Sequence, residues 1–258
     1  MSIEIQSLRA LKDNYIWLIK NSANNQAICV DPGDAQPVLD IIKKENIDLC
    51  AILITHHHWD HTAGLDELTR DNNIIIYGPK KSNNNKYTYN LSDGDIISFD
   101  KLNLNFTIME TPGHTLDHIC YFSPSILLSG DTLFSGGCGR VFEGNAEQML
   151  ASLSRLAALP PETRLYCAHE YTEANLQFAL HLEPHNSVLI ERYAEVKNLR
   201  KHSKNTLPST IALEKETNPF LRCHLSSIQK AASAYCHKKI DDPIATFAVI
   251  RAWKNEFL

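Results

Sequence analysis

Short runs of apolar and β-branched residues recur through the first two-thirds of this 258-residue chain, and they constrain its fold more than any other feature. Such runs predict β-strands, at 15–19, 27–30, 51–55, 73–78, 96–99, 104–109, 118–122, 125–129 and 164–168. Between them, residues 35–46 and 146–159 carry apolar side chains at helical spacing. Strands mixed with helices in this way predict an α/β architecture with at least one sheet covered by helices.

The pattern changes after about residue 172, where strand candidates nearly vanish. Helical patterns follow at 173–182, 187–202 and 226–239. The polar, proline-containing stretch 203–220 is expected to be an irregular connection between them. We therefore predict two domains, a larger one over residues 1–171 and a smaller, mostly helical one over residues 172–258.

Charge and hydropathy limit the partners of the chain. The formal net charge of -5 argues against nucleic acid, whose binders need a basic surface. No stretch approaches the ~20 apolar residues of a membrane span. Charged residues interrupt the N-terminal segment where a signal peptide would need an apolar region: Glu4, Arg9, Lys12 and Asp13. We expect a cytoplasmic monomer with no nucleic-acid or membrane partner.

The seven cysteines agree with a reducing compartment. Cys29, Cys50, Cys120 and Cys167 fall within apolar, strand-like runs. This placement favours small buried residues over disulfides, and no pair has the Cys-x-x-Cys spacing of a zinc clip.

A cluster of histidines, in the sequence ITHHHWDHTAG, directly follows the third predicted strand. In an extended segment His56 and His58 share one side and His57 points away. Asp60 and His61 come next, at the turn. Imidazole and carboxylate donors in this pattern suit divalent zinc, iron or manganese. A histidine-rich surface loop is the alternative, and its position behind a buried strand argues against it; we expect His57 to support the site or to pack rather than to ligate.

Three further donors occur at junctions between a strand and a loop. The sequence METPGHTLDH presents His114 after a Thr-Pro-Gly turn, LLSGDTLF ends a strand at Asp131, and LYCAHEYT ends another at His169. Each alone is weak evidence and has a structural explanation. Together and in this order, they are hard to attribute to chance.

This order of donors resembles the signature of the metallo-β-lactamase superfamily, His-x-His-x-Asp-His followed by His, Asp and His. The resemblance implies an αβ/βα four-layer sandwich with two metals at the sheet edges. It assigns the first metal to His56, His58 and His114, the second to Asp60, His61 and His169, and a bridging position to Asp131. We expect two divalent ions per chain, zinc first, with iron and manganese as alternatives.

Further motifs, spread over nearly the whole chain, are similar to glyoxalase II, the hydroxyacylglutathione hydrolase family. They are LKDNYIWLI, THHHWDHTAG, SGDTLFSGGCGRVFEG, CAHEYTEANLQFA, TNPFLR and IRAWKNEF. The resemblance implies hydrolysis of the thioester S-D-lactoylglutathione to D-lactate and glutathione, the second step of methylglyoxal detoxification. It also implies that the helical C-terminal domain helps to form the glutathione site.

The donor set fits this chemistry. Metal-bound water titrates near neutrality, so a hydroxide between two ions is available to attack the thioester carbonyl. A thiol has a pKa near ~8.5, so the thiolate leaves without a dedicated acid. In this scheme Asp60 and Asp131 act in catalysis through the bridging hydroxide, Asp60 mainly by binding and orienting the second metal.

The resemblance assigns five residues to substrate binding, namely Arg140, Phe142, Tyr171, Arg251 and Lys254. Arg251 and Lys254 share one face if this end is helical, and the resemblance puts them near the glycine carboxylate; from the residues alone they read as a solvated helix edge. Arg140 stands where family members often have lysine, which keeps the charge. Phe142 stands where many have tyrosine, which removes one hydroxyl contact.

Several alternatives remain. Cys138 invites comparison with a nucleophile, but no histidine adjoins it in sequence, and we interpret it as a small residue in a glycine-rich loop. A lactonase, a β-lactamase or a one-iron persulfide dioxygenase is opposed by the complete second-metal set and the Arg251/Lys254 terminus. A nuclease is opposed by the net charge. A non-catalytic binding protein is opposed by the presence of every ligand.

Overall fold

The computed structural model describes residues 3–70, 74–82 and 84–257. The chain divides into two compact units by its internal contacts. Unit 1 comprises Met1–Glu110, Asp117–Ser123 and Leu127–Gly130, and unit 2 comprises Thr111–Leu116, Pro124–Ile126 and Asp131–Leu258. This division follows contacts, and the domain boundary expected between residues 171 and 172 stays a prediction.

Unit 1 contains a six-stranded sheet with its strands in chain order. The strands are β1 (Ile3–Ala10), β2 (Asn14–Asn21), β3 (Gln26–Val30), β4 (Asp48–Leu53), β5 (Ile75–Pro79) and β6 (Tyr89–Leu91). The pairs β1–β2 and β2–β3 are antiparallel, whereas the pairs from β3 to β6 are parallel. The carboxyl ends of parallel strands meet at one edge of a sheet, so the residues that follow β3 and β4 come together there.

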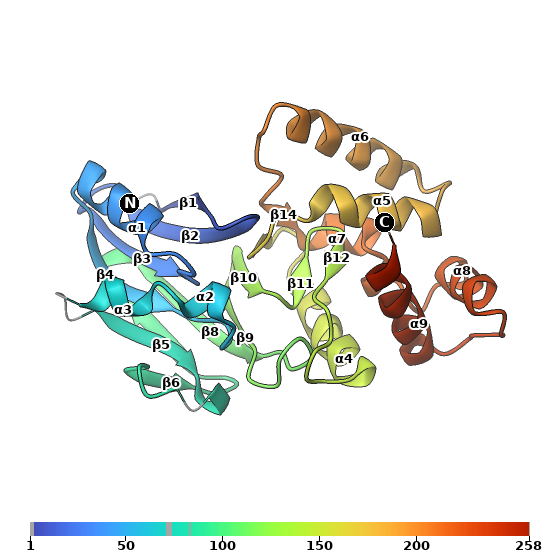
Figure 1. Cartoon of the computed structure of the whole chain (residues 1–258), viewed down its shortest axis with the longest axis horizontal. Coiled ribbons are helices and arrows are strands. Elements are labelled where there is room, and N and C mark those ends of the chain that lie inside the picture. Colours follow the sequence, from blue (N-terminus) through green and yellow to red (C-terminus); the bar gives the residue numbers. More distant parts are fainter. Residues whose placement is uncertain (1–2, 71–73, 83, 258) are drawn as a thin grey trace. The chain divides into compact units, whose positions relative to one another are not determined.

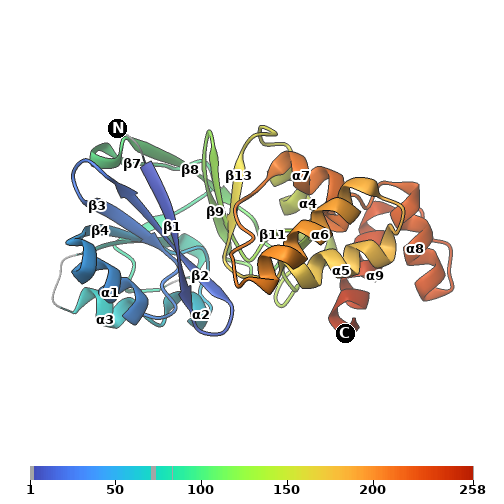
Figure 2. The ribbon, with the colours of Figure 1, turned by 90° about the horizontal axis from the view of Figure 1, so that it is seen from above.

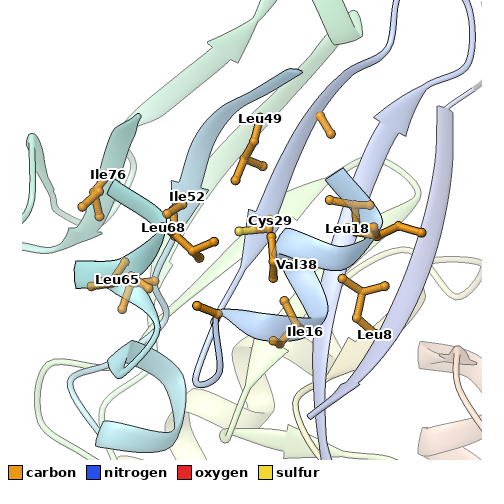
Figure 3. Packing of buried hydrophobic residues seen from close by; sticks show 14 of the residues in the cluster. Leu8, Ile16, Leu18, Cys29, Val38, Leu49, Ile52, Leu65, Leu68 and Ile76 are labelled. Carbon is orange, nitrogen blue, oxygen red and sulfur yellow. The ribbon is translucent and has the colours of Figure 1, made fainter. Parts of the chain in front are cut away.

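Helices cover one face of this sheet. They are α1 (Gln36–Glu45) and α3 (Leu65–Thr69), and the short helix α2 (Trp59–Thr62) precedes α3 in the chain. Proline in the first turn of α1 and Asn46 in the left-handed region after its last turn begin and end that helix. Figure 3 shows Val38 of α1 and Leu68 of α3 packed toward the sheet, in a buried cluster that includes Cys29 and Ile52.

A second group of strands in unit 1 has the order β10-β9-β8-β7. These strands are β7 (Ile96–Phe99), β8 (Leu104–Glu110), β9 (Ile119–Ser123) and β10 (Ile126–Gly130), the last with residues 127–130 in unit 1. The one-turn helices η1 (Lys80–Ser82) and η2 (Asp100–Leu102) lie between strands. The hydroxyl of the fully buried Tyr121 donates to the carbonyl of Ile54 at 2.7 Å, which ties β9 to the end of β4.

Unit 2 is mostly helical (Figure 1). Its helices are α4 (Ala146–Ala157), α5 (Thr172–Leu182), α6 (Ser187–Lys201), α7 (Ile211–Thr217), η3 (Pro219–Leu221), α8 (Ser226–Cys236) and α9 (Pro243–Glu256). Its strands are β11 (Leu133–Phe134), β12 (Gly137–Cys138), β13 (Arg164–Cys167) and β14 (Ser209–Thr210), which pair as β11–β12 and β13–β14. Helices α5 and α6 lie side by side in Figure 2, with Leu176, Ala179, Leu189 and Val196 buried in one cluster.

The mixed architecture expected from the sequence is confirmed, and each predicted strand overlaps an observed one. Residue 73, the first of one predicted strand, lies outside the described residues. The predicted helices are also observed, and the carboxyl-terminal residues form α9. No helix in the described part of the chain combines the length and the apolar character needed to cross a bilayer.

One prediction is wrong. The stretch 203–220 is not irregular throughout, because it contains β14, α7 and η3. Helix α7 begins after Thr210, whose side chain accepts a hydrogen bond from the backbone of Leu213. The helix also buries Glu214 completely, and that carboxylate is paired with Arg192 of α6. A helix held by a partner on another helix leaves little local signal in the sequence.

Candidate active site

The donors predicted after β4 lie together in unit 1. The ring of His56 is centred 4.6 Å from that of His58 and 4.1 Å from that of His61. His61 Nε2 lies 3.5 Å from Asp60 Oδ2. Helix α2 carries Asp60 and His61, so the chain turns back on itself directly after His58. His56 and His61 are fully buried, as ligands of an enclosed ion would be.

The remaining three donors lie together in unit 2. His114 Nε2 is 3.4 Å from Asp131 Oδ2, and His169 Nε2 is 3.3 Å from Asp131 Oδ1. All three side chains are buried.

These distances allow a test of whether the residues fit metal ions. They exceed the ~2.7–2.9 Å of a charge-assisted hydrogen bond. They match the separation of about 3.4 Å between two ligands that each lie about 2.1 Å from a tetrahedral ion. Both units thus present nitrogen and oxygen atoms spaced as ligands of divalent cations.

Contacts of Nδ1 in unit 1 orient the rings of His56 and His61. The Thr55 hydroxyl donates to Asp31 Oδ2 at 2.7 Å, so its oxygen accepts from His56 Nδ1 at 3.0 Å. Asp31 Oδ2 also lies 3.0 Å from His61 Nδ1. Both histidines are therefore oriented to offer Nε2 to a cation, in the carboxylate–histidine arrangement typical of metal sites. His57 Nδ1 instead lies 3.0 Å from Asp117 Oδ1, and its supporting role stays a prediction.

Asp31 and Asn14 are site residues that the sequence reasoning missed. Asp31 follows β3 in the sequence VDPGD, so its place at a strand end is the signal that it shares with the other donors. The amide of Asn14 donates to the carbonyl and to Oδ2 of Asp60, at 3.2 and 3.1 Å. Gly33 allows this close packing, because a Cβ there would lie 1.8 Å from the Asp60 carbonyl oxygen.

In unit 2, His114 is tied to the predicted substrate residues. Its Nδ1 donates to the carbonyl of Arg140 at 2.8 Å, which leaves Nε2 facing Asp131. The backbone N–H of Phe142 donates to the carbonyl of His114 at 3.2 Å. The Phe142 ring lies edge-on to the His114 ring, with centroids 5.2 Å apart, and the side chain is 62% exposed. An apolar surface therefore adjoins this donor.

Tyr171 adjoins the other histidine of unit 2. Its ring stacks on that of His169, with centroids 4.8 Å apart and an interplanar angle of 1°. Tyr171 is the residue before the first turn of α5, and its ring stays partly exposed. A residue predicted to contact substrate thus lies against a predicted metal donor.

Helix α9 carries the remaining predicted cations. Lys254 donates to the carbonyl of Ala174 at 3.3 Å. Its pKa is lowered to about 8, first by burial and then by the positive charges of Arg251 and Arg140. These three cations are therefore close enough to repel one another, which is an arrangement that favours an anionic ligand.

Arg251 differs from the expected solvated helix edge. It is buried, with Nη1 donating to the carbonyl of Cys138 at 2.7 Å and the guanidinium 4.9 Å from the centre of the Phe220 ring. Cys138 is buried as well, and burial raises the pKa of its thiol to about 11. A thiol with this pKa is a poor nucleophile at neutral pH, which agrees with a packing role.

Comparison with known proteins agrees with this picture. Residues 11–169 match the metallo-beta-lactamase superfamily, and residues 170–257 match the hydroxyacylglutathione hydrolase C-terminus. A hydroxyacylglutathione hydrolase of Nitrosomonas eutropha is 49% identical over 255 residues, which cover 99% of each chain. Among solved structures, ETHE1 from Myxococcus xanthus is similar with a TM-score of 0.66 and 24% identity over 100% of both chains. The di-iron-bound form of TTHA1623 has a TM-score of 0.58 and 23% identity over 84% of this chain and 100% of that one; both likenesses show the fold alone.

The strand-end donors and the mixed α/β fold thus define a protein of the metallo-β-lactamase superfamily, which implies a divalent metal pair for this chain. Within that superfamily, the chain belongs to the hydroxyacylglutathione hydrolase family. The family and the hydrolase class predicted from the motifs are confirmed.

Proposed function

We propose that this protein hydrolyses S-D-lactoylglutathione to D-lactate and glutathione, the second step of methylglyoxal detoxification. One observation carries the proposal. Arg140 binds the metal donor His114 through its backbone carbonyl and lies, with its charge, near Lys254. A predicted metal donor and a cationic residue are thus joined by a hydrogen bond, which suits a substrate whose thioester carbonyl lies in the same molecule as anionic carboxylates.

The proposal includes the ligand set expected from the resemblance. The first ion takes His56, His58 and His114, the second takes Asp60, His61 and His169, and Asp131 belongs to both. When bound, such a pair of ions lowers the pKa of water and polarises a carbonyl oxygen. We take zinc as the metal, because tetrahedral nitrogen and oxygen ligation suits it.

The side chains around these donors keep them in place. Asn14 holds the carboxylate of Asp60, the Asp31 carboxylate lies against Nδ1 of His61, and the Arg140 carbonyl fixes His114. Each contact fixes one orientation of a donor before a substrate arrives, so little reorganisation is needed during reaction. The leaving thiolate needs no proton from the protein, because a thiol with a pKa near ~8.5 gives a weakly basic thiolate that leaves readily.

Substrate binding falls to residues of unit 2. Arg140, Arg251 and Lys254 attract the carboxylates of glutathione. The partly exposed ring of Tyr171 offers a hydroxyl, and the exposed Phe142 offers an apolar contact. Both rings lie against predicted metal donors, which suits contact with a substrate close to its reacting carbonyl.

We further propose that the protein acts in the cytoplasm as a monomer. All seven cysteines are free thiols, and five of them are buried. This agrees with a compartment in which thiols stay reduced.

The test is steady-state hydrolysis of S-D-lactoylglutathione, with metal analysis of the same preparation. The matched substrate is the D-lactoyl thioester of N-acetylcysteamine, which lacks both carboxylates. We expect about two metals per chain and a kcat/KM at least about a hundredfold higher for the glutathione thioester. Two metals per chain with equal turnover of both thioesters, or with turnover of lactones only, would reject glutathione as the thiol.

A further inference from the structure

Residues 134–138, here called the clamped loop, comprise the turn between β11 and β12 in unit 2 and the strand residues next to it. Buried amides bind its carbonyl groups. Asn218 donates to the carbonyls of Phe134 and Gly137, at 3.2 and 2.9 Å. Asn175 of α5 donates to the carbonyl of Ser135 at 3.1 Å.

Glu214 of α7 binds the centre of the clamped loop. Its Oε2 accepts from the backbone N–H of Gly136 at 2.7 Å, and its Oε1 accepts from Arg192 Nη2 at 2.5 Å. Arg192 Nη2 also donates to the hydroxyl of Ser135 at 2.9 Å. Glu214 is 0% exposed and Arg192 is 6% exposed, so the ion pair is fully enclosed.

A buried ion pair of this kind is a poor source of stability, because removing both charges from water costs about as much as their attraction returns. Its effect is on geometry. Each oxygen of Glu214 has its own donors, since Ser209 and Arg192 bind Oε1 while Gly136 and Asn218 bind Oε2. The pair therefore fixes where the Gly136 backbone lies.

The clamped loop has little to hold it in place by itself. Gly136 has φ +70°, a conformation that disfavours side chains, and a Cβ there would lie 2.7 Å from Leu176 Cδ2. The paired strands on either side of the turn contribute only two residues each. The buried side chains of Asn175, Arg192, Glu214 and Asn218 must therefore fix the position of the clamped loop, because the short strands do not.

The chain leaves the clamped loop directly into the site. Gly139 is packed so closely that a Cβ would lie 2.0 Å from the carbonyl oxygen of Asp131. Arg140 follows, and its carbonyl accepts from His114 Nδ1. A shift of the clamped loop would therefore move the backbone of Arg140. That would displace its cationic side chain, which we propose binds substrate, and its carbonyl, which orients His114.

We propose that Glu214 is a positioning residue of the active site, which acts through the clamped loop on Arg140 and His114. This proposal rests on the proposed function for its effect on substrate, but its effect on metal binding does not depend on the substrate. Glu214 acts on Arg140 and His114 indirectly. Its own hydrogen-bond partners are Arg192, Ser209, Asn218 and the Gly136 backbone.

The test compares Glu214→Gln with Glu216→Gln, a matched change on the exposed side of the same helix. A glutamine has one acceptor oxygen, so it leaves either Gly136 or the Arg192 side without its acceptor. At saturating zinc we expect the KM of Glu214→Gln for S-D-lactoylglutathione to rise at least about tenfold, with kcat within about threefold. Zinc affinity should fall about tenfold, measured by competition with a chelator, and Glu216→Gln should match the unmodified protein in both.

A folded Glu214→Gln protein with unchanged KM and unchanged zinc affinity would overturn the proposal, whatever its melting temperature. Arg192→Lys provides a second variant if Glu214→Gln does not fold, because it keeps the charge pair and loses the fork that reaches Ser135 and Ser209. The same two readouts apply to it. If the unmodified protein binds zinc but does not hydrolyse the thioester, the proposed function fails, and the zinc readout still decides the role of Glu214.

Discussion

Asn14 holds Asp60 by two hydrogen bonds from one amide group, to the backbone carbonyl at 3.2 Å and to Oδ2 at 3.1 Å. Asn14 begins β2, whereas Asp60 lies in α2. The contact therefore fixes a predicted metal donor from a strand that carries no donor itself.

Asn14→Ala should weaken zinc binding about tenfold or more, because the Asp60 carboxylate loses the group that orients it. The measurement is chelator competition followed at two metals per chain. Asn24→Ala is the control, since the Asn24 side chain binds the Lys101 carbonyl and the Gln26 N–H in a turn that carries no predicted donor. Equal zinc affinity in the Asn14 variant and the control would show that Asp60 orients itself.

Asp31→Asn should also weaken zinc binding, by about 10–100-fold. Asp31 has φ +53°, which asparagine adopts readily, so the change removes charge with little added backbone strain. The variant loses the carboxylate that lies beside Nδ1 of His61. Asp34→Asn, on the same turn, should keep normal zinc affinity, and a loss of affinity in both variants would point to the turn rather than to the carboxylate.

Lys254 should give KM a pH dependence. Its pKa of about 8 means that the amine is charged below about pH 8 and neutral above it. We expect KM for the anionic substrate to rise as pH increases from 7 to 9.5. Lys254→Met should raise KM at pH 7 and remove most of this dependence; a dependence that survives in the variant would assign the titration to another group.

The charge of Lys254, which should favour substrate binding, should lower the stability of the folded protein. The folded protein lowers the pKa of Lys254 from 10.5, so the folded state disfavours its charge. This cost is fully present below about pH 8 and disappears as pH rises toward 10.5. Lys254→Met should therefore melt at a higher temperature than the unmodified protein at pH 7, with a smaller difference at pH 10, as measured by calorimetry.

Phe142→Tyr should lower KM about threefold with kcat unchanged, because an added hydroxyl on an exposed ring gains one hydrogen bond to the substrate. Phe142→Leu is the matched control, which keeps apolar area without a hydroxyl. A KM equal to that of the unmodified protein in the tyrosine variant would place the ring outside the substrate site.

Cys138→Ala should keep kcat within about twofold, because the buried thiol stays protonated at neutral pH and takes no part in acyl transfer. Turnover under saturating substrate measures this. A loss of kcat by several orders of magnitude, with zinc content unchanged, would instead support Cys138 as a nucleophile.

The sequence was informative where physics is local. Apolar runs predicted the strands, and Asp31 and His61 lie close together because the parallel strands β3 and β4 end at the same edge of their sheet. Asp31 fits that rule and was missed, because it belongs to no recognised motif and acts only through Thr55 and His61.

Features that depend on distant partners could not be predicted. Helix α7 depends on Glu214, whose partner Arg192 is 22 residues earlier. The i,i+3 spacing of Arg251 and Lys254 suggested a shared helix face but not the burial of Arg251, which binds a carbonyl 113 residues away. The lowered pKa of Lys254 likewise comes first from its burial and then from the charges of Arg251 and Arg140, which the local sequence does not reveal.

Asp131 presents one carboxylate oxygen to His114 and the other to His169, at 3.4 and 3.3 Å. In the proposed ligand set these histidines bind different ions, and Asp131 is the one residue that binds both. A lineage could abandon the second ion by losing His61 or His169 and still retain a working first ion. Under that ligand set, loss of Asp131 would remove one ligand from each ion, whereas loss of His61 or His169 would remove a ligand from the second ion alone.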